Sequence, residues 1–167
     1  MNKKVKIIIC GILSVCVGYL LLWNIYVTRT FQPYIKKLGG TWNGNMYVLQ
    51  QEDYTYCVVP PVFPKITGNL AITENLVVDE DGKAEDTASI LIWLLPGNQK
   101  EIGISVETSG NNQDEYSIER VEEEFYLNSA MQLEQPVDKH IQQVYQDNYE
   151  KIQELYSKAY NEWGILK

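Results

Sequence analysis

The feature that most constrains the fold is an apolar run near the N-terminus. Ile7–Val27 spans 21 residues, of which only Ser14 and Asn24 are clearly polar. As an α-helix it would rise about 30 Å, the thickness of the hydrocarbon layer of a bilayer. Trp23 and Tyr26 lie near its far end, where aromatic side chains favour the membrane–water interface. The run therefore predicts a transmembrane helix over residues 7–27.

A cleaved signal peptide is the main alternative for this run. Its apolar region would be about 7 to 15 residues long and would end in a small-x-small cleavage site. Here the run is longer, and the segment Asn24–Thr28 has no Ala-x-Ala pattern. Leu13-Ser14-Val15-Cys16 also departs from the lipoprotein motif, which has Gly, Ala or Ser before the cysteine. We therefore expect an uncleaved signal anchor.

Basic residues flank the run on both sides and bear on its orientation: Lys3, Lys4 and Lys6 before it, and Arg29, Lys36 and Lys37 after it. The lysine-rich, very short tail favours a cytoplasmic N-terminus, and the second group weakens that bias. We expect residues 1–27 to form a short cytoplasmic tail and transmembrane anchor, and residues 28–41 a juxtamembrane stalk with a brief helical stub at its end. Residues 42–167 are then an extracytoplasmic, β-rich domain of a single-pass cell-membrane protein.

The rest of the chain is strongly acidic. All 22 acidic residues lie at or beyond Glu52. From Leu38 onward the chain has these 22 acidic residues and 8 basic ones, which gives this part a net charge of −14. This charge argues against nucleic acid as a partner and disfavours anionic lipid. The chain has 16 Ile against 5 Ala and 12 Lys against 2 Arg. That bias is typical of an A/T-rich coding sequence, and we take a bacterial origin as a hypothesis.

After the expected stalk the apolar pattern changes to a period of two, which is typical of β-strands. The strands expected from it lie at residues 54–58, 66–73, 89–95, 102–106 and 116–127, the last as one strand or two, with turns at 96–99 and 110–112. Ser89–Leu95 is apolar on both faces, which predicts a central strand covered on both sides. The second cover would be the stub near Tyr34 or the proline-rich crossing Pro60–Pro64.

A helix is expected to close the chain, from about Val137 to Trp163, between Pro136 and Gly164. It carries an apolar flank and a stripe of tyrosines beside it. The predicted fold class is α+β: an N-terminal transmembrane helix, then an antiparallel β-meander packed against a long C-terminal amphipathic helix.

No motif for catalysis or metal binding is recognisable. His140, the only histidine, falls on the polar arc of the predicted helix, and Cys57 lies on a predicted strand with no histidine near it in sequence. The acidic loop Asp79–Asp86 has its glycine at position 4, where a calcium-binding EF-hand needs it at position 6. We expect no catalytic, cofactor-binding or metal-ligating residues, no cofactor and no enzymatic activity.

Gly40-Thr41-Trp42 resembles the Gly-x-Trp opening of lipocalins, and this three-residue resemblance implies binding of a small molecule. The 12 tyrosines suit either a protein interface or the seam between helix and sheet. We expect a membrane-anchored interaction or accessory module that binds protein, with another membrane or surface protein as its partner. The alternative is a domain that binds a small molecule or a cell-wall glycan.

Overall fold

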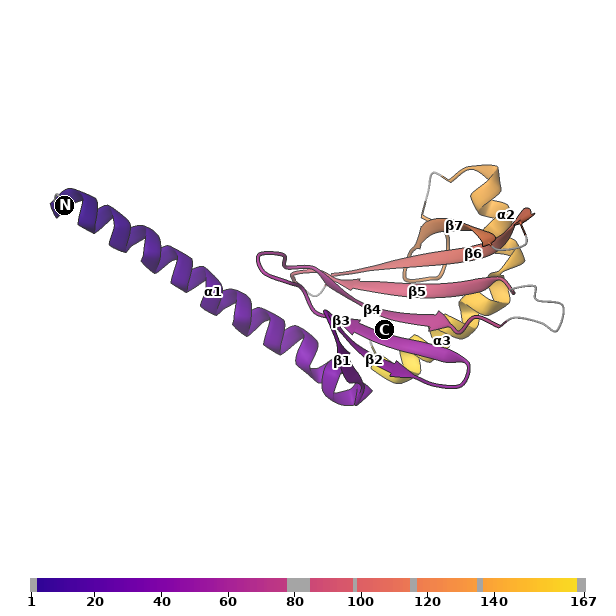
Figure 1. The fold of residues 1–167 in the computed structure, drawn as a ribbon, viewed down its shortest axis with the longest axis horizontal. Coiled ribbons are helices and arrows are strands. Elements are labelled where there is room, and N and C mark those ends of the chain that lie inside the picture. Colours follow the sequence, from indigo (N-terminus) through magenta and orange to yellow (C-terminus); the bar gives the residue numbers. More distant parts are fainter. Residues whose placement is uncertain (1–2, 78–84, 98, 115–116, 135–136, 165–167) are drawn as a thin grey trace.

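The computed structural model describes residues 3–77, 85–97, 99–114, 117–134 and 137–164. A long N-terminal helix leads into a seven-stranded antiparallel sheet, and two helices follow at the C-terminal end (Figure 1). The predicted α+β class is therefore confirmed. Most of the expected acidic loop, from Asp79 to Ala84, lies outside the described residues.

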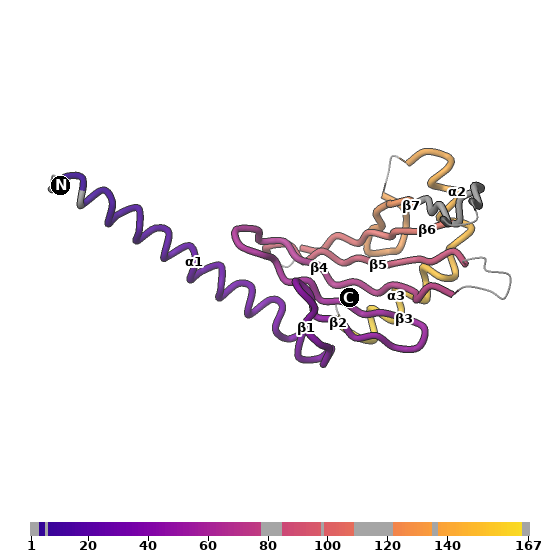
Figure 2. The backbone as a smooth tube through the Cα atoms, in the orientation of Figure 1, coloured from indigo at the N-terminus to yellow at the C-terminus, as the bar shows by residue number. Residues whose placement is uncertain are grey.

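The N-terminal helix, α1 (Lys3–Leu38), is long and apolar enough to cross a membrane, as both an anchor and a signal sequence would be. Its N-terminal half projects away from the other elements (Figure 2). The helical stub expected near residues 34–38 is not a separate, brief element, because the helix continues unbroken through Pro33 to Leu38. Phe31 and Leu38 are buried in the core, and such tertiary packing stabilises the final turns. The helix ends at Gly39, whose φ of 62° suits a C-terminal cap.

The sheet is a meander in which each strand pairs with the next. Its strands are β1 (Thr41–Asn43), β2 (Met46–Gln50), β3 (Tyr54–Val59), β4 (Gly68–Glu74), β5 (Thr87–Leu94), β6 (Lys100–Asp114) and β7 (Ser117–Leu127). The turn expected at residues 110–112 was wrong, since β6 runs through it with a register shift between Ser109 and Gln113. Because β1 and β7 are the edges, the sheet is open and not closed into a barrel.

The C-terminal helix expected as one element is two, α2 (Lys139–Asp147) and α3 (Tyr149–Trp163). Asp138 caps α2 by accepting a 2.9 Å hydrogen bond from the backbone N–H of Ile141. The interruption is at Asn148, whose side-chain amide donates a 3.0 Å bond to the carbonyl of Val144. Asparagine competes in this way with the backbone hydrogen bonds of a helix, so it favours helix ends.

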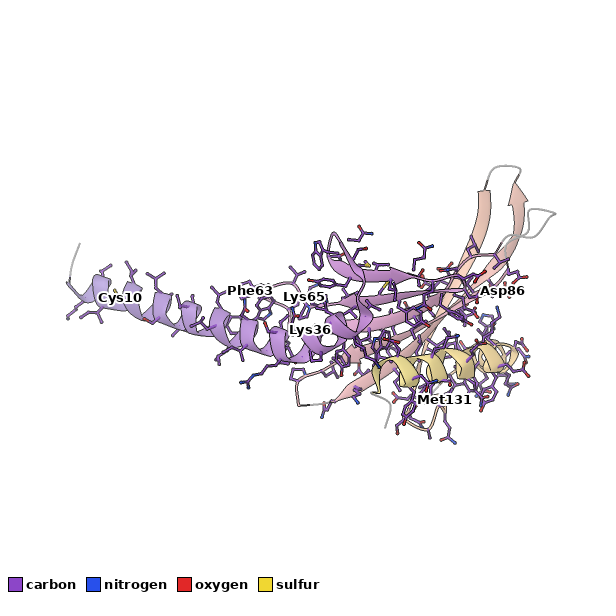
Figure 3. The ribbon with its side chains drawn as sticks, turned by 90° about the horizontal axis from the view of Figure 1, so that it is seen from below. Cys10, Lys36, Phe63, Lys65, Asp86 and Met131 are labelled. Atoms are coloured by element: carbon purple, nitrogen blue, oxygen red, sulfur yellow. The ribbon has the colours of Figure 1, made fainter. Side chains whose placement is uncertain are left out.

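The core lies on one face of the sheet only. Along β5, Ala88, Ile90, Ile92 and Leu94 are buried, and the residues between them are half-buried. The helix α3 covers that face, and the last turns of α1 pack on β2 and β3 (Figures 1 and 3). No described helix covers the opposite face, and the proline-rich crossing reaches only its end, beside Trp93. The prediction of a strand covered along both sides was therefore wrong.

Candidate functional site

The uncovered face of the sheet, which we call the open face, carries an apolar and aromatic centre. Its members are Val48, Cys57, Leu91, Trp93 and Tyr126, which alternate with the core residues of their strands. The rings of Trp93 and Tyr126 lie 5.8 Å apart between centroids, and 46% of Tyr126 is exposed.

Glycine makes room for the largest side chain of this face. A Cβ on Gly103 would lie 2.5 Å from Cζ3 of Trp93, so the indole lies directly over the glycine. Trp93 and its neighbours on the open face bury one another in part, and no described helix or strand lies over them. That is the physical reason why both faces of β5 are apolar in sequence although only one is covered by a helix.

Carboxylates border the aromatic centre on the β6–β7 side. Glu101, Glu122 and Glu124 share the face by strand alternation, and all three are exposed. Glu122 accepts a 2.7 Å hydrogen bond from the hydroxyl of Ser105, which fixes its direction. The open face therefore combines apolar area with negative charge.

A cleft of about 400 Å³ lies at the end of the open face nearest to α1. The loop Pro60–Thr67, between β3 and β4, forms one wall, and Asn69 and Trp93 contribute to the other. The side-chain oxygen Oδ1 of Asn69 is buried and accepts no hydrogen bond from the described residues. A small polar ligand would find an acceptor and an indole ring there.

The same loop packs against α1. Phe63 packs edge-on against the rings of Tyr19 and Trp23, with both centroid distances at 5.6 Å. Figure 3 shows Phe63 and Lys65 beside the helix. The loop therefore connects the cleft to the long helix.

A second cleft, of about 200 Å³, lies at the opposite end of the sheet among acidic side chains. Nζ of Lys151 lies 3.4 Å from Oε2 of Glu74 and donates a 2.7 Å hydrogen bond to the carbonyl of Asp86. Glu74 also accepts a 2.9 Å bond from the N–H of Ala88. These contacts tie α3 to β4 and β5. Within the residues that the structure describes, no three His, Cys, Asp or Glu side chains are grouped to hold a metal.

Cys57 and His140, the two residues weighed for chemistry, are not brought together. Cys57 lies on the open face of β3, where burial raises the pKa of its thiol and keeps it protonated. His140 lies on α2 and is mostly exposed, with Nε2 at 3.0 Å from Oε1 of Glu123. Glu123 belongs to the covered side of β7.

Several tyrosines of the C-terminal helices pack between these helices and the sheet. The hydroxyl of Tyr145 donates a 2.7 Å bond to the carbonyl of Met131, and that of Tyr156 a 3.2 Å bond to the carbonyl of Ser129. Both rings pack on the core cluster. Tyr149 is 40% exposed and lies outside that cluster. Within the stripe of tyrosines predicted for this helix, Tyr145 and Tyr156 therefore hold the helices on the sheet.

Sequence reasoning missed the open face as a surface, because the apolar alternate positions of β5 were assigned to a second covered side. It also missed the contact between the proline-rich loop and α1. The signals available were Gly103 in a strand next to the one that carries Trp93, and the apolar residues Val62 and Phe63 between the prolines.

No protein-family model matches this chain, and no curated protein or solved structure is significantly similar to it.

Proposed function

We propose that this chain is a single-pass membrane protein whose anchor is retained, with its N-terminus in the cytoplasm and the sheet domain outside the cell membrane. Its role is non-enzymatic: the domain binds another membrane or surface protein through the open face. The observation that carries this proposal is the uncovered, aromatic and acidic face of an otherwise well-packed sheet.

One feature of α1 supports retention of the anchor. Tyr19 and Trp23, which lie within the apolar run, contact Phe63 of the β3–β4 loop. A cleavage between positions 24 and 28 would remove these contacts and leave Phe63 without its aromatic neighbours. The mature N-terminus, measured by mass spectrometry on protein from native membranes, tests this: a start beyond Val17 overturns the anchor.

The chemistry of the open face supports a protein partner with a complementary surface. Trp93 and Tyr126 provide the large, amphipathic rings that are enriched in protein interfaces. Glu101, Glu122 and Glu124 border these rings and add to the negative charge of the domain. The complementary surface is an apolar patch bordered by lysine or arginine side chains.

Site-specific photocrosslinking in native membranes tests this function. A benzophenone side chain at position 126 reports on the open face, and one at position 153 reports on the exposed side of α3. We expect a discrete crosslinked product from position 126 and none from 153. The double charge reversal Glu101→Lys and Glu124→Lys should suppress the product, because it removes the attraction to basic side chains. Equal products at both positions, or no effect of the charge reversal, would overturn the assignment.

Binding of a small molecule or a cell-wall glycan is the second candidate. The cleft beside Trp93, with the unpaired Oδ1 of Asn69 among the described residues, favours it. Titration of the full chain with cell-wall oligosaccharides, followed by tryptophan fluorescence, should then give a saturable change. Trp93→Phe should abolish that change and Trp42→Phe should leave it.

A further inference from the structure

The β3–β4 loop (Pro60–Thr67) reaches α1 well before the helix enters the domain. The hydroxyl of Tyr19 donates a 3.1 Å hydrogen bond to the carbonyl of Pro64, and Nε1 of Trp23 donates a 2.7 Å bond to the carbonyl of Lys65. Figure 1 shows the loop extending from the sheet toward the projecting helix.

The position of these contacts along the helix sets the depth of the loop relative to the membrane. Both tyrosine and tryptophan lie inside the apolar run Ile7–Val27. At 1.5 Å per residue, Tyr19 is about 12 Å and Trp23 about 6 Å before the end of the run. When the run spans the hydrocarbon layer, the loop is therefore level with lipid.

The loop exposes apolar side chains at this level. Val62 is 63% exposed, Phe63 44% and Ile66 43%. Between Asp53 and Glu74 the chain has no acidic residue, and Lys65 is the only charged residue of the loop. The acidity that disfavours contact of the domain with anionic lipid is therefore absent here, and Lys65 can place its ammonium group among headgroups.

The backbone of the loop is also suited to a medium with little water. Pro60, Pro61 and Pro64 have no N–H to leave unpaired. The N–H of Lys65 donates a 2.9 Å bond to the carbonyl of Val62. The carbonyls of Pro64 and Lys65 accept the hydrogen bonds from Tyr19 and Trp23 of α1. Non-helical backbone at membrane depth needs such internal pairing.

We propose that the β3–β4 loop inserts into the lipid on the domain side of the membrane, beside α1, as a second membrane contact of this protein. The proposal rests on the proposed function of α1 as a retained anchor. Its partner is the bilayer itself, through Val62, Phe63 and Ile66 in the interfacial region and Lys65 at the headgroups.

Depth-dependent fluorescence quenching of the full chain in phosphatidylcholine vesicles tests the proposal. Cys10, Cys16 and Cys57 are replaced by alanine, and a single cysteine carries an NBD label. The labelled sites are Val62→Cys in the loop, Leu13→Cys in the anchor and Glu52→Cys in the turn at the far end of the sheet. Circular dichroism melts confirm that the three labelled proteins fold alike, and Ile66→Cys replaces Val62→Cys if that variant melts early.

We expect doxyl-lipids to quench the label at position 62 several-fold more than the label at position 52. Doxyl groups near the headgroup should quench it best, whereas the label at position 13 should be quenched best by groups deep in the acyl chains. Quenching at position 13 without quenching at position 62 overturns the loop insertion and leaves the anchor intact. Absence of quenching at position 13 overturns the anchor, and with it the insertion that rests on it.

Discussion

The ring of Phe31 occupies the space that a side chain at Gly68 would need. Its Cζ lies 2.7 Å from the position of a Cβ on that glycine, and the carbonyl oxygen of Val59 lies 2.3 Å from the same point. The helix α1 and the start of β4 thus fit together only because residue 68 has no side chain.

Gly68→Ala is expected to destabilise the protein by about 1–3 kcal/mol, the usual cost of overpacking a filled core. Neither neighbour can yield easily, since one is backbone and the other a fully buried ring. Thermal unfolding in detergent micelles, followed by circular dichroism, measures the effect. Thr67→Ala, at the exposed neighbouring position, is the control and should change stability by less than about 0.5 kcal/mol. Equal melting temperatures for the two variants would refute the tight fit.

Gly103→Ala should behave differently, because its close neighbour is the far end of an indole on the open face. Trp93 can turn outward, so the expected loss of stability is below about 1 kcal/mol. The displaced ring should shift the tryptophan emission to longer wavelength and weaken the crosslink from position 126. A crosslink of unchanged intensity, with a shifted emission, would argue that the position of Trp93 is unimportant for binding.

Tyr156→Ala should cost about 2 kcal/mol, less than the 3–5 kcal/mol of a fully buried aromatic side chain. The ring packs on the core and its hydroxyl is bonded to the carbonyl of Ser129. Chemical denaturation of the variant and of wild type gives the difference. Lys139→Ala and His140→Ala, at exposed positions of α2, serve as controls and should stay within about 0.5 kcal/mol. A Tyr156→Ala protein as stable as these controls would assign the ring to partner binding.

Alkaline pH should destabilise the fold through tyrosines that are buried or half-buried. Burial raises the pKa of Tyr56, Tyr145 and Tyr156, and for Tyr54 the hydrogen bond to Glu154 adds to burial. An unfolded tyrosine titrates near pH 10, so above that pH the unfolded chain holds fewer protons than the folded one and stability falls as pH rises. Melting temperatures at about pH 9 and about pH 11 measure the fall.

Tyr54→Phe provides the control for this pH effect. It removes one ionisable group whose folded pKa is raised, so the decline in melting temperature between the two pH values should be smaller than in wild type. A decline of the same size in both proteins would show that Tyr54 does not contribute, and a melting temperature independent of pH would show that none of these tyrosines lowers stability at alkaline pH.

The parts of the fold that follow from local periodicity were predictable. The apolar run identified the long helix, and alternation located most strands. What depends on contacts between distant segments was not. Nothing near Pro33 indicates that Phe31 and Leu38 would be buried by the sheet and so hold the helix together. The break at Asn148 depends on one side-chain hydrogen bond, which competes with a helical pattern that continues on both sides.

The candidate site was less accessible to sequence reasoning than the fold. The five consecutive apolar residues Ile90–Leu94 of β5 predict two covered faces, and this pattern is the same whether the second cover is a helix or neighbouring side chains. Only the structure shows Trp93 lying on Gly103 and Tyr126. The contact of Trp23 with Lys65 joins residues 42 positions apart, and no local pattern encodes it.

Because α1 is one continuous helix, no flexible linker separates the apolar segment from the sheet. One residue added between Trp23 and Phe31 would turn the N-terminal part of the helix by about 100° relative to the domain. The indole would then miss the loop while Phe31 stayed in the core. If the apolar run is the retained anchor proposed above, the rotation of the helix sets the direction in which the open face points relative to the membrane, and hence the side on which the proposed partner can bind.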